Sequence, residues 1–260
     1  MDRERLRLGL IGWPLSRSLS PLIHEEFLRA AGRSGSYARI AVPRARAAEA
    51  ARLLWRRGMD GLNVTIPCKL AVRSACVGIA PSAREAGAVN TLQRGEEGWI
   101  GHNTDIAGFS AMADEAGAGP PYLVVGCGGA ARAVAAACRR RGEAVSLYCR
   151  RPGAWRGTDG VLPLKALAVR LGRGTLVNAT PLGWRSDDPF PVPAKALRGM
   201  CLLDLNYSRD WEWRRQAAAA ADSVRTGEVM LVHQAAESFG IWTGNRPKTD
   251  TALTRVRNAI

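Results

Sequence analysis

Hydrophobic residues along the chain recur with the spacings of alternating strands and helices. The first segment, from Leu6 to Gly12, alternates apolar and polar positions and predicts a strand. It is followed by Ser20-Pro21, which predicts a helix start with Ser20 as the capping residue, and by an apolar stripe that ends at Gly32. The same patterns predict strands over residues 38–42, 61–65, 88–92 and 98–102 and helices over 47–57 and 105–117. Strands that alternate with helices are typical of a parallel α/β sheet.

A second unit is predicted after the glycine- and proline-rich run at residues 117–121, the clearest break in the pattern. A buried strand follows at once, then a glycine-rich turn, a helix and another strand, over residues 122–125, 126–131, 131–141 and 144–149. Later segments predict strands over 175–179 and 201–205 and a long helix over 227–242. The 260 residues suit one large domain or two modest ones, and the pattern favours two.

Composition narrows the class of protein. With 47% hydrophobic and 23% charged residues, the chain has the makeup of a folded globular protein. Its first residues are charged and no run of about 18 apolar residues follows, so we expect a cytoplasmic protein without membrane association. The six cysteines form no C-x-x-C pair and the three histidines are dispersed, which predicts a reducing compartment and no metal site.

The basic residues are unusual in kind as well as number. A net charge of +14 could attract nucleic acid, but no recognition motif accompanies it, so we expect no nucleic-acid partner and favour dinucleotide phosphates. Only four of the 37 basic residues are lysine: Lys69, Lys165, Lys195 and Lys248. Since lysine can lose its proton and arginine effectively cannot, each lysine is a candidate for proton chemistry.

The turn from Gly126 to Ala131 has the pattern G-x-G-x-x-A, directly after a strand and before a helix. The first glycine allows a tight turn, the second a close approach to a pyrophosphate, and the small last residue close helix–sheet packing. The helix start adds unpaired N–H groups for phosphates. We therefore predict dinucleotide binding; the alternative is a glycine loop that only packs tightly.

The end of the next strand indicates which dinucleotide is bound. An acidic residue there would favour NAD, but the chain has Cys149-Arg150-Arg151. Arginine suits the 2′-phosphate of NADP because it offers paired N–H donors. NADP is therefore favoured and NAD stays possible, since both arginines could instead be solvated loop charges.

Candidate substrate groups lie at three predicted strand ends or helix starts in the first half. Ser18 and Ser20 offer hydroxyls to a carboxylate at a helix start, or Ser20 only caps the helix. Lys69 follows Pro67, where we predict a helix whose dipole would lower the pKa of the lysine; the alternative is a solvated surface lysine. Asp105 begins the next helix and should stay ionised, or it only caps that helix.

These segments together resemble the shikimate dehydrogenase family over nearly the whole chain and in the family's order. Each motif is weak evidence, but eight in register are specific. They are Ile11–Pro14 to His24, Asn63–Thr65 to Lys69, Gly87–Thr91, Asn103–Asp105 with Gly108, Gly126–Arg132, Asn178–Gly183, Asp204 with Tyr207, and Gly227–Gln234 leading to Trp242–Gly244.

The resemblance implies reversible, NADPH-dependent reduction of 3-dehydroshikimate to shikimate, a step of chorismate and aromatic amino-acid biosynthesis. It implies an open α/β substrate domain over 1–106 and 227–260, to which the C-terminal helix returns, and a Rossmann-like NADP-binding domain over 107–226. The implied catalytic pair is Lys69 and Asp105. The implied substrate residues are Ser18, Ser20, Thr65, Asn90, Gln234 and, at the carboxylate, Tyr207. The implied cofactor residues are Gly126, Cys127, Gly128, Gly129, Ala130 and Arg150, with Leu205 and Gly227 near the nicotinamide.

Departures from the family pattern keep alternatives open. Arg17 stands where the family commonly has histidine, and Cys149 and Arg151 replace the usual asparagine and threonine around Arg150. The helix expected after Arg151 is shortened or absent, which leaves the choice between NADP and NAD less firm. The alternative functions are those of a relative that also oxidises quinate, of a relative that acts on an aminated shikimate analogue, and of a catalytically silent ligand sensor. The sensor would be expected to lose Lys69 or Asp105. We expect a monomer or a homodimer.

Overall fold

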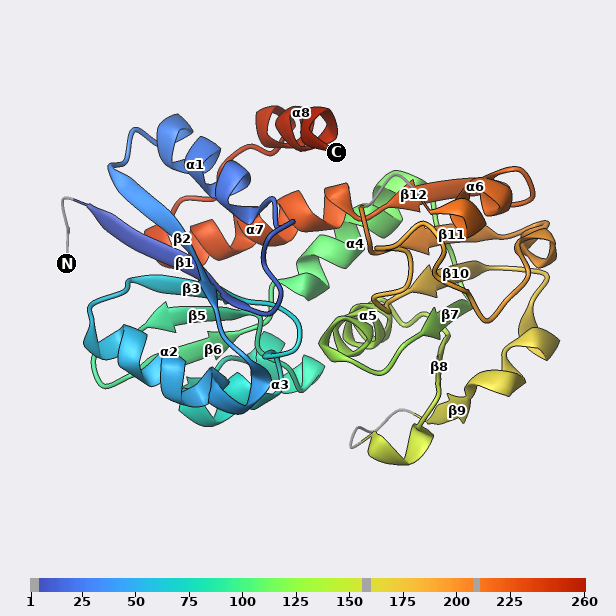
Figure 1. Cartoon of the computed structure of the whole chain (residues 1–260), viewed down its shortest axis with the longest axis horizontal. Helices are drawn as coiled ribbons and strands as arrows, with labels where there is room; N and C mark the ends of the chain where they lie inside the picture. Colours follow the sequence, from blue (N-terminus) through green and yellow to red (C-terminus); the bar gives the residue numbers. More distant parts are fainter. Residues whose placement is uncertain (1–4, 156–159, 208–210) are drawn as a thin grey trace. The chain divides into compact units, whose positions relative to one another are not determined.

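The computed structural model describes residues 5–155, 160–207 and 211–260 (Figure 1). The chain divides into two compact units, one formed by residues up to Gly108 together with Leu231–Ala259 and the other by Phe109–Met230. Two helices, α4 (Asp105–Ala116) and α7 (Glu228–Thr243), run across the two divisions. The C-terminal part of the chain therefore returns to the first unit, as the sequence predicted.

The first unit contains a six-stranded sheet in the order β2-β1-β3-β5-β6-β4. Its strands are β1 (Leu6–Gly12), β2 (Gly35–Ala41), β3 (Gly61–Val64), β4 (Cys76–Ile79), β5 (Thr91–Arg94) and β6 (Trp99–His102). The predicted parallel arrangement holds except at β5, which runs antiparallel to β3 and to β6. Because the turn between β5 and β6 is short and closed by Gly95 N–H to Gly98 O, at 2.8 Å, it forms a hairpin.

Helices cover both faces of this sheet (Figure 1). The helices of the unit are α1 (Ser20–Ala30), α2 (Ala47–Arg56), α3 (Pro81–Ala86), α8 (Asp250–Ala259) and the unit's parts of α4 and α7, with 3-10 helices at Arg44–Arg46 and Ala71–Ala75. Successive side chains of β3 point to opposite faces of the sheet. Leu62 and Val64 join the apolar core that includes Ala47 and Ala51 of α2, whereas Asn63 points to the face of Tyr37, to which it is hydrogen-bonded.

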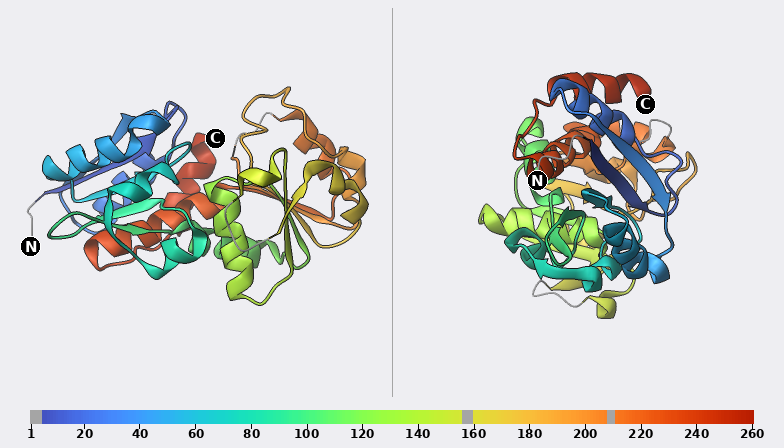
Figure 2. Two further views of the ribbon diagram at one scale, coloured as in Figure 1. Left: turned by 90° about the horizontal axis from the view of Figure 1, so that it is seen from below. Right: turned by 90° about the vertical axis from the view of Figure 1, so that its left-hand side faces the viewer.

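Helices α7 and α8 are held on the first unit by specific side-chain contacts. A side chain at Gly61 would meet the Trp242 ring at 2.4 Å, so a glycine is required for α7 to lie this close to β3. The indole N–H of Trp242 donates to Leu92 O at 3.0 Å. Helix α8 lies beside α1 (Figure 2), and Arg255 pairs with the buried Glu26 at 2.9 Å. These contacts explain why the last helices belong to the first unit.

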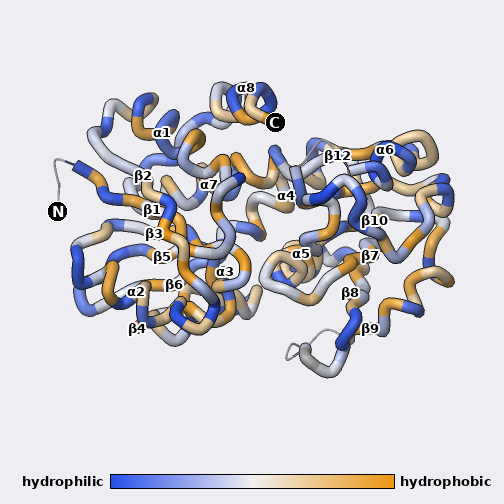
Figure 3. The backbone as a smooth tube through the Cα atoms, in the orientation of Figure 1, coloured by the Kyte–Doolittle hydropathy of each residue, from blue (hydrophilic) through white to orange (hydrophobic). Residues whose placement is uncertain are grey.

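The second unit contains a wholly parallel six-stranded sheet in the order β12-β11-β10-β7-β8-β9. Its strands are β7 (Tyr122–Val125), β8 (Val145–Cys149), β9 (Val161–Pro163), β10 (Thr175–Asn178), β11 (Cys201–Asp204) and β12 (Ser223–Thr226). Numbered within the unit, this is the order 3-2-1-4-5-6 of dinucleotide-binding folds. All four residues of the central strand β7 are buried, which is typical of a sheet covered on both faces. Figure 3 shows the hydropathy of the residues along the backbone.

The described connections of this unit contain more 3-10 helices than α-helices. Helix α5 (Gly129–Arg140) follows β7 and α6 (Glu212–Ala218) precedes β12. After β8 the described residues form a 3-10 helix at Pro152–Ala154, and the described residues between β8 and β9 contain no α-helix. Further 3-10 helices lie at Leu164–Ala166, Ala168–Arg170 and Ala194–Leu197. The described residues between Arg151 and β9 therefore lack the α-helix that the family pattern leads one to expect there, as the sequence suggested.

No helix among the described residues is both long enough and apolar enough to cross a membrane.

Candidate active site

Lys69 and Asp105 form an ion pair in the first unit. Lys69 lies in the turns between β3 and the 3-10 helix Ala71–Ala75, and Asp105 is the first residue of α4. The Lys69 Nζ to Asp105 Oδ2 distance is 2.6 Å, and the side chains are only 13% and 6% exposed. A charge-assisted hydrogen bond in this setting fixes both groups. The predicted juxtaposition of amine and carboxylate is therefore present.

The predicted reason for the position of Lys69 is wrong. No α-helix begins at Pro67; residues 66–70 are turns, and the short 3-10 helix starts only at Ala71. A helix dipole is therefore not available to act on this lysine. Its main electrostatic partner is instead the carboxylate of Asp105.

Asn90 holds the other oxygen of the Asp105 carboxylate. Its Nδ2 donates to Asp105 Oδ1 at 2.9 Å, and its Oδ1 accepts the Thr104 backbone N–H at 2.7 Å. Gln234 Oε1 lies 3.5 Å from the same Nδ2. Asn90 is 2% exposed and Gln234 is 9% exposed. The structure therefore brings the predicted Asn90 to the ion pair and the predicted Gln234 to Asn90.

A buried group of polar side chains behind Asn90 was not predicted as a unit. It consists of Asn63, Thr91, Thr104 and Ser238, all within hydrogen-bonding distance of one another or of Asn90. We refer to it as the hydroxyl cluster. The signal in the sequence is Ser238, a polar residue four positions after Gln234 within the apolar stripe of α7.

The two predicted serines lie together at the start of α1. Ser18 Oγ and Ser20 Oγ are 3.2 Å apart, and the Ser20 backbone N–H donates to Ser18 Oγ at 3.3 Å. The prediction that Ser20 caps the helix is wrong, because Ser20 is the first helical residue and no side chain makes a capping bond. Thr65 is half-buried after β3 and its backbone N–H bonds to Ile11 O at 2.9 Å.

The glycine-rich turn has the shape that a dinucleotide pyrophosphate requires. Gly126 has φ +130°, and a side chain there would lie 2.8 Å from Ala179 O at the end of the neighbouring strand. A side chain at Gly128 would meet no atom within 4 Å, so there is open space before the first turn of α5. The turn lies between β7 and β10, where the strand order reverses, the place where such folds bind ligands.

Arginines gather beside this turn in the second unit. Arg150 is exposed at the end of β8, and the Arg132 guanidinium lies over the Trp155 ring, 4.1 Å from its centroid. Burial raises the pKa of the Cys127 thiol to about 11, and the nearby Arg132 and Arg150 oppose that rise. Arg132 lies in the first turn of α5, and Arg150 follows β8, which pairs with β7, so both residues neighbour the turn.

The residues predicted near the nicotinamide and substrate carboxylate also lie in this unit. Gly227 N–H donates to Asn206 O at 3.1 Å, and a side chain at Gly227 would collide with Leu205 O. Tyr207 is half-buried, its ring edge-on to Trp184 at 5.0 Å. The structure thus gives the local packing of Leu205, Gly227 and Tyr207, and their contacts with the nicotinamide and the substrate remain predictions.

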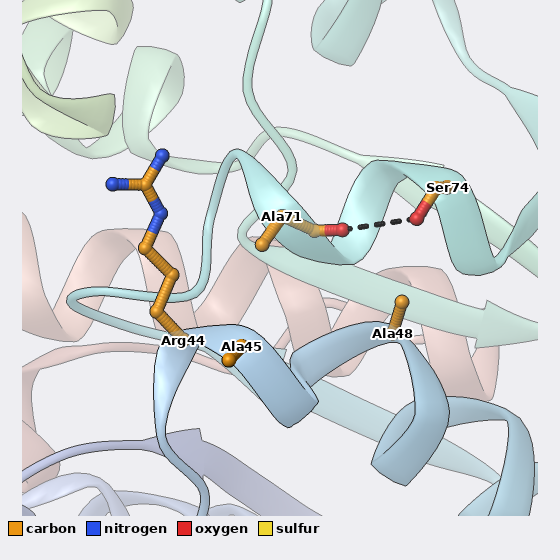
Figure 4. Close-up of a pocket in the computed structure, with 5 residues that line it drawn as sticks. All are labelled: Arg44, Ala45, Ala48, Ala71 and Ser74. Carbon is orange, nitrogen blue, oxygen red and sulfur yellow. Dashed lines mark hydrogen bonds between the residues drawn. The ribbon is translucent and has the colours of Figure 1, made fainter.

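A surface hollow of about 530 Å³ lies elsewhere in the first unit (Figure 4). It is lined by Arg44, Ala45, Ala48, Ala71 and Ser74, and the serine hydroxyl is engaged with the carbonyl of Ala71 at 3.2 Å. Its lining is mostly alanine and no polar groups converge in it, so it does not have the makeup of a substrate site.

The fold and these groups define a class: a two-domain α/β protein with a dinucleotide-binding unit and a buried amine–carboxylate pair in its other unit. Comparisons with known proteins narrow the class. The chain matches the family descriptions "Shikimate dehydrogenase substrate binding domain" over residues 10–92 and "Shikimate 5'-dehydrogenase C-terminal domain" over 227–257.

Similar proteins cover almost the whole chain. "Shikimate dehydrogenase (NADP(+))" of Acidiphilium cryptum is 39% identical, over 95% of this chain and 94% of its own. The protein of that name from Thermus thermophilus is 35% identical, over 98% and 99%. A solved structure of the shikimate 5-dehydrogenase of Thermus thermophilus "in complex with NADP(H) and shikimate" has a TM-score of 0.84 at 33% identity, over 98% of this chain and 100% of that one. The chain belongs to the shikimate dehydrogenase family.

Proposed function

We propose that this protein is an NADP-dependent shikimate dehydrogenase that reversibly reduces 3-dehydroshikimate to shikimate. The observation that carries the proposal is the 2.6 Å pair of Lys69 and Asp105, nearly buried and held by Asn90. Relatives named shikimate dehydrogenase (NADP(+)) at 35–39% identity over nearly the full chain support it. Since both members of the pair are present, a catalytically silent sensor is disfavoured.

The pair suits the proton part of the reaction. NADPH, when bound, supplies the hydride for the carbonyl carbon of the substrate. Protonated Lys69 then gives a proton to the oxygen, where negative charge develops as the carbon–oxygen double bond becomes a single bond. An ammonium group has three N–H donors, and among the described residues Asp105 takes one of them. The others can reach the substrate oxygen, and the carboxylate orients the resulting hydroxyl.

The substrate would be held by polar side chains of the first unit. The hydroxyls of Ser18 and Ser20 offer donors to the substrate carboxylate, whose charge the start of α1 also favours. Thr65, Asn90 and Gln234 would bind the ring hydroxyls. Tyr207 of the second unit would add a donor to the carboxylate. These roles are proposals that rest on the family's motifs and on the local geometry of each residue.

The second unit fits NADP. The open space before Gly128, the start of α5 and the close packing at Gly126 suit a pyrophosphate. Arg150 would bind the 2′-phosphate, and Cys127, Gly129 and Ala130 would line the turn. Leu205 and Gly227 would lie near the nicotinamide. These assignments follow the glycine turn and the strand order of the sheet.

The test is a steady-state assay of NADP reduction at alkaline pH, with shikimate and quinate as separate substrates and NAD as the alternative cofactor. We expect the highest kcat/KM with shikimate and NADP. Comparable efficiency with quinate would assign the protein to the relatives that accept both acids. A clear preference for NAD would contradict the role of Arg150, and no turnover with any combination would contradict the proposed function.

Assembly and location stay predictions. We propose a monomer or homodimer, which sedimentation at several concentrations would distinguish. The six cysteines are unpaired in the structure, in keeping with the proposed cytoplasmic location.

A further inference from the structure

We infer that Ser238 is a positioning residue of the active site, which fixes the orientation of the Asn90 amide and through it the carboxylate of Asp105. The inference rests on the proposed function, because it concerns the proton-transfer pair of that reaction. Ser238 lies on α7, is completely buried and contacts neither Lys69 nor Asp105 in the hydrogen bonds of the structure. Its action must therefore pass through the hydroxyl cluster.

Four groups surround the Ser238 hydroxyl. Its Oγ donates to the Gln234 carbonyl one helical turn earlier, at 2.9 Å. Asn63 Nδ2 donates to the same Oγ at 2.9 Å. The hydroxyl oxygens of Thr91 and Thr104 lie 2.9 Å and 3.1 Å from it. All four neighbours are within hydrogen-bonding distance of Ser238 Oγ, so the donor and acceptor of each hydrogen bond can be assigned in turn.

The count leaves Ser238 as an acceptor toward the threonines. Its single proton goes to the Gln234 carbonyl, and an amide nitrogen such as Asn63 Nδ2 can only donate. One lone pair of Ser238 Oγ then remains, and it can accept a proton from only one of the two threonine hydroxyls. The other threonine must direct its proton elsewhere.

The second threonine proton has Asn90 Oδ1 within reach. That oxygen lies 3.1 Å from Thr91 Oγ1 and 3.3 Å from Thr104 Oγ1, so either threonine can donate to it. The other acceptor within reach is the oxygen of the neighbouring threonine, since the two hydroxyl oxygens are 3.2 Å apart. Asn90 Oδ1 also accepts the Thr104 backbone N–H at 2.7 Å, and a threonine hydroxyl can be its second donor. Its Nδ2 must then face the Asp105 carboxylate, at 2.9 Å.

The reversed amide would be unfavourable at both ends. It would set Asn90 Oδ1 against a carboxylate oxygen of Asp105 and Nδ2 against the backbone N–H of Thr104. Ser238 supports this orientation, because it contacts both threonine hydroxyls that border Asn90 Oδ1. A donor to the ionised form of a carboxylate favours that form, so losing it would move the acid limb of the activity to higher pH. Among the described residues, Lys69 is the charged group bonded to Asp105.

The central variant is Ser238→Ala. It removes the acceptor of one threonine proton and of Asn63 Nδ2, and both donors stay buried. We expect kcat to fall roughly fivefold to tenfold, the size of one lost hydrogen bond, with KM for shikimate changed less than about twofold. We expect the acid limb of the kcat profile to move up by roughly half a pH unit.

The matched control is Thr243→Ala on the same helix. Thr243 Oγ1 also donates to the carbonyl four residues earlier, at 2.7 Å to Phe239 O, but it lies outside the hydroxyl cluster. This variant should keep the wild-type kcat and pH profile. A fall in kcat of equal size in both variants would assign the effect of Ser238→Ala to the helix and would overturn the inference.

A double-mutant cycle tests the route of the effect. If Ser238 acts through Asn90, Ser238→Ala should have little further effect on kcat in an Asn90→Ala background. Independent, additive losses would overturn the inference, as would a Ser238→Ala enzyme whose turnover and pH profile match the wild type once the folded fraction is measured.

A readout without turnover separates this inference from the proposed function. In ¹⁵N-labelled protein, the two side-chain N–H signals of Asn90, assigned with the Asn90→Ala variant, should shift and broaden in Ser238→Ala and stay in place in Thr243→Ala. That result would support the positioning role even if shikimate were not the substrate. Unchanged Asn90 signals would overturn it, whereas absence of shikimate oxidation by the wild type would count against the proposed function alone.

Discussion

At the scale of single residues, the chain places one lysine where a proton is needed. Three of its four lysines are exposed, whereas Lys69 is 13% exposed and bonded to Asp105. We predict that Lys69→Ala lowers kcat by roughly 10²–10⁴-fold with little change in KM for shikimate, because the variant removes the proton donor and not the binding hydroxyls. Steady-state kinetics in both directions measure the effect.

The exposed Lys248 provides the control for this variant. Lys248→Ala carries the same change of charge in the same unit, away from the ion pair, and should keep the wild-type kcat. Equal kcat values for the wild type and Lys69→Ala would refute the proton-transfer role. A rise in KM with kcat unchanged would make Lys69 a binding residue.

A second residue-scale prediction concerns stability in acid. His24 is fully buried and stacked on Tyr37, with ring centroids 4.3 Å apart, and burial lowers its pKa to about 3. The unfolded chain protonates this histidine near its ordinary pKa of 6.5, but the folded protein does not. The folded state therefore loses stability as the pH falls from the unfolded pKa toward the folded one. The loss from this group is about 1.4 kcal/mol per pH unit, or about 2 to 3 kcal/mol between roughly pH 6.5 and 4.5.

The variant that checks this is His24→Phe, which keeps an aromatic ring among Phe27, Tyr37 and Phe239. Free energies of unfolding from urea titrations at several pH values should show a shallower acid slope for the variant than for the wild type. Parallel slopes would mean that His24 is protonated in the folded protein or that the ring reaches solvent.

At the scale of elements, the sequence predicted those with strong periodicity. The strands Leu6–Gly12 and Tyr122–Val125 lie where alternation or a continuous apolar run predicted them. Strands β4, β9 and β12 were missed because each is three or four residues long and only partly buried, too short for a period to emerge. The antiparallel direction of β5 depends on a hairpin turn, which a strand pattern does not encode.

The active site was predicted to a similar extent. Lys69, Asn90, Asp105 and Gln234 were identified because they end strands or begin helices, or because they match the family's motifs, and the structure brings them together. The sequence signals only the Ser238 member of the hydroxyl cluster, since threonine and serine have no characteristic spacing and the contact of Ser238 with Asn63 spans 175 residues. Tertiary packing alone decides which buried hydroxyls meet.

A prediction about cofactor binding concerns the segment after β8. Here the chain has a 3-10 helix in place of a longer one, and Trp155 packs over Arg132 in the first turn of α5. We predict that Trp155→Leu raises KM for NADP by roughly threefold to tenfold, because a cation–π contact holds Arg132 beside the glycine turn. The KM for shikimate should be nearly unchanged.

Trp155→Phe is the matched control, because it keeps an aromatic face for Arg132 and should retain most of the affinity for NADP. If Trp155→Leu left the KM for NADP at its wild-type value, the contact would have no part in cofactor binding. If it raised the KM values of NADP and shikimate alike, the change would have spread beyond the second unit.

At the scale of the whole molecule, the net charge of +14 produces a positive electrostatic potential that attracts anionic ligands. NADP carries several negative charges on its phosphates, whereas shikimate carries one on its carboxylate. Salt screens such fields: the Debye length falls from roughly 20 Å at about 20 mM to roughly 6 Å at about 300 mM. We therefore predict that KM for NADP rises severalfold over this range and that KM for shikimate rises much less.

Both constants can be measured in one sodium chloride series with kcat as the internal check. The slope of log KM against log salt should be steeper for NADP than for shikimate, because the screened attraction scales with ligand charge. Arg150→Ala should reduce the NADP slope and leave the shikimate slope alone, since that arginine is exposed beside the glycine turn. Equal slopes for the two ligands would mean that the arginine-rich surface serves solubility and not the capture of the cofactor.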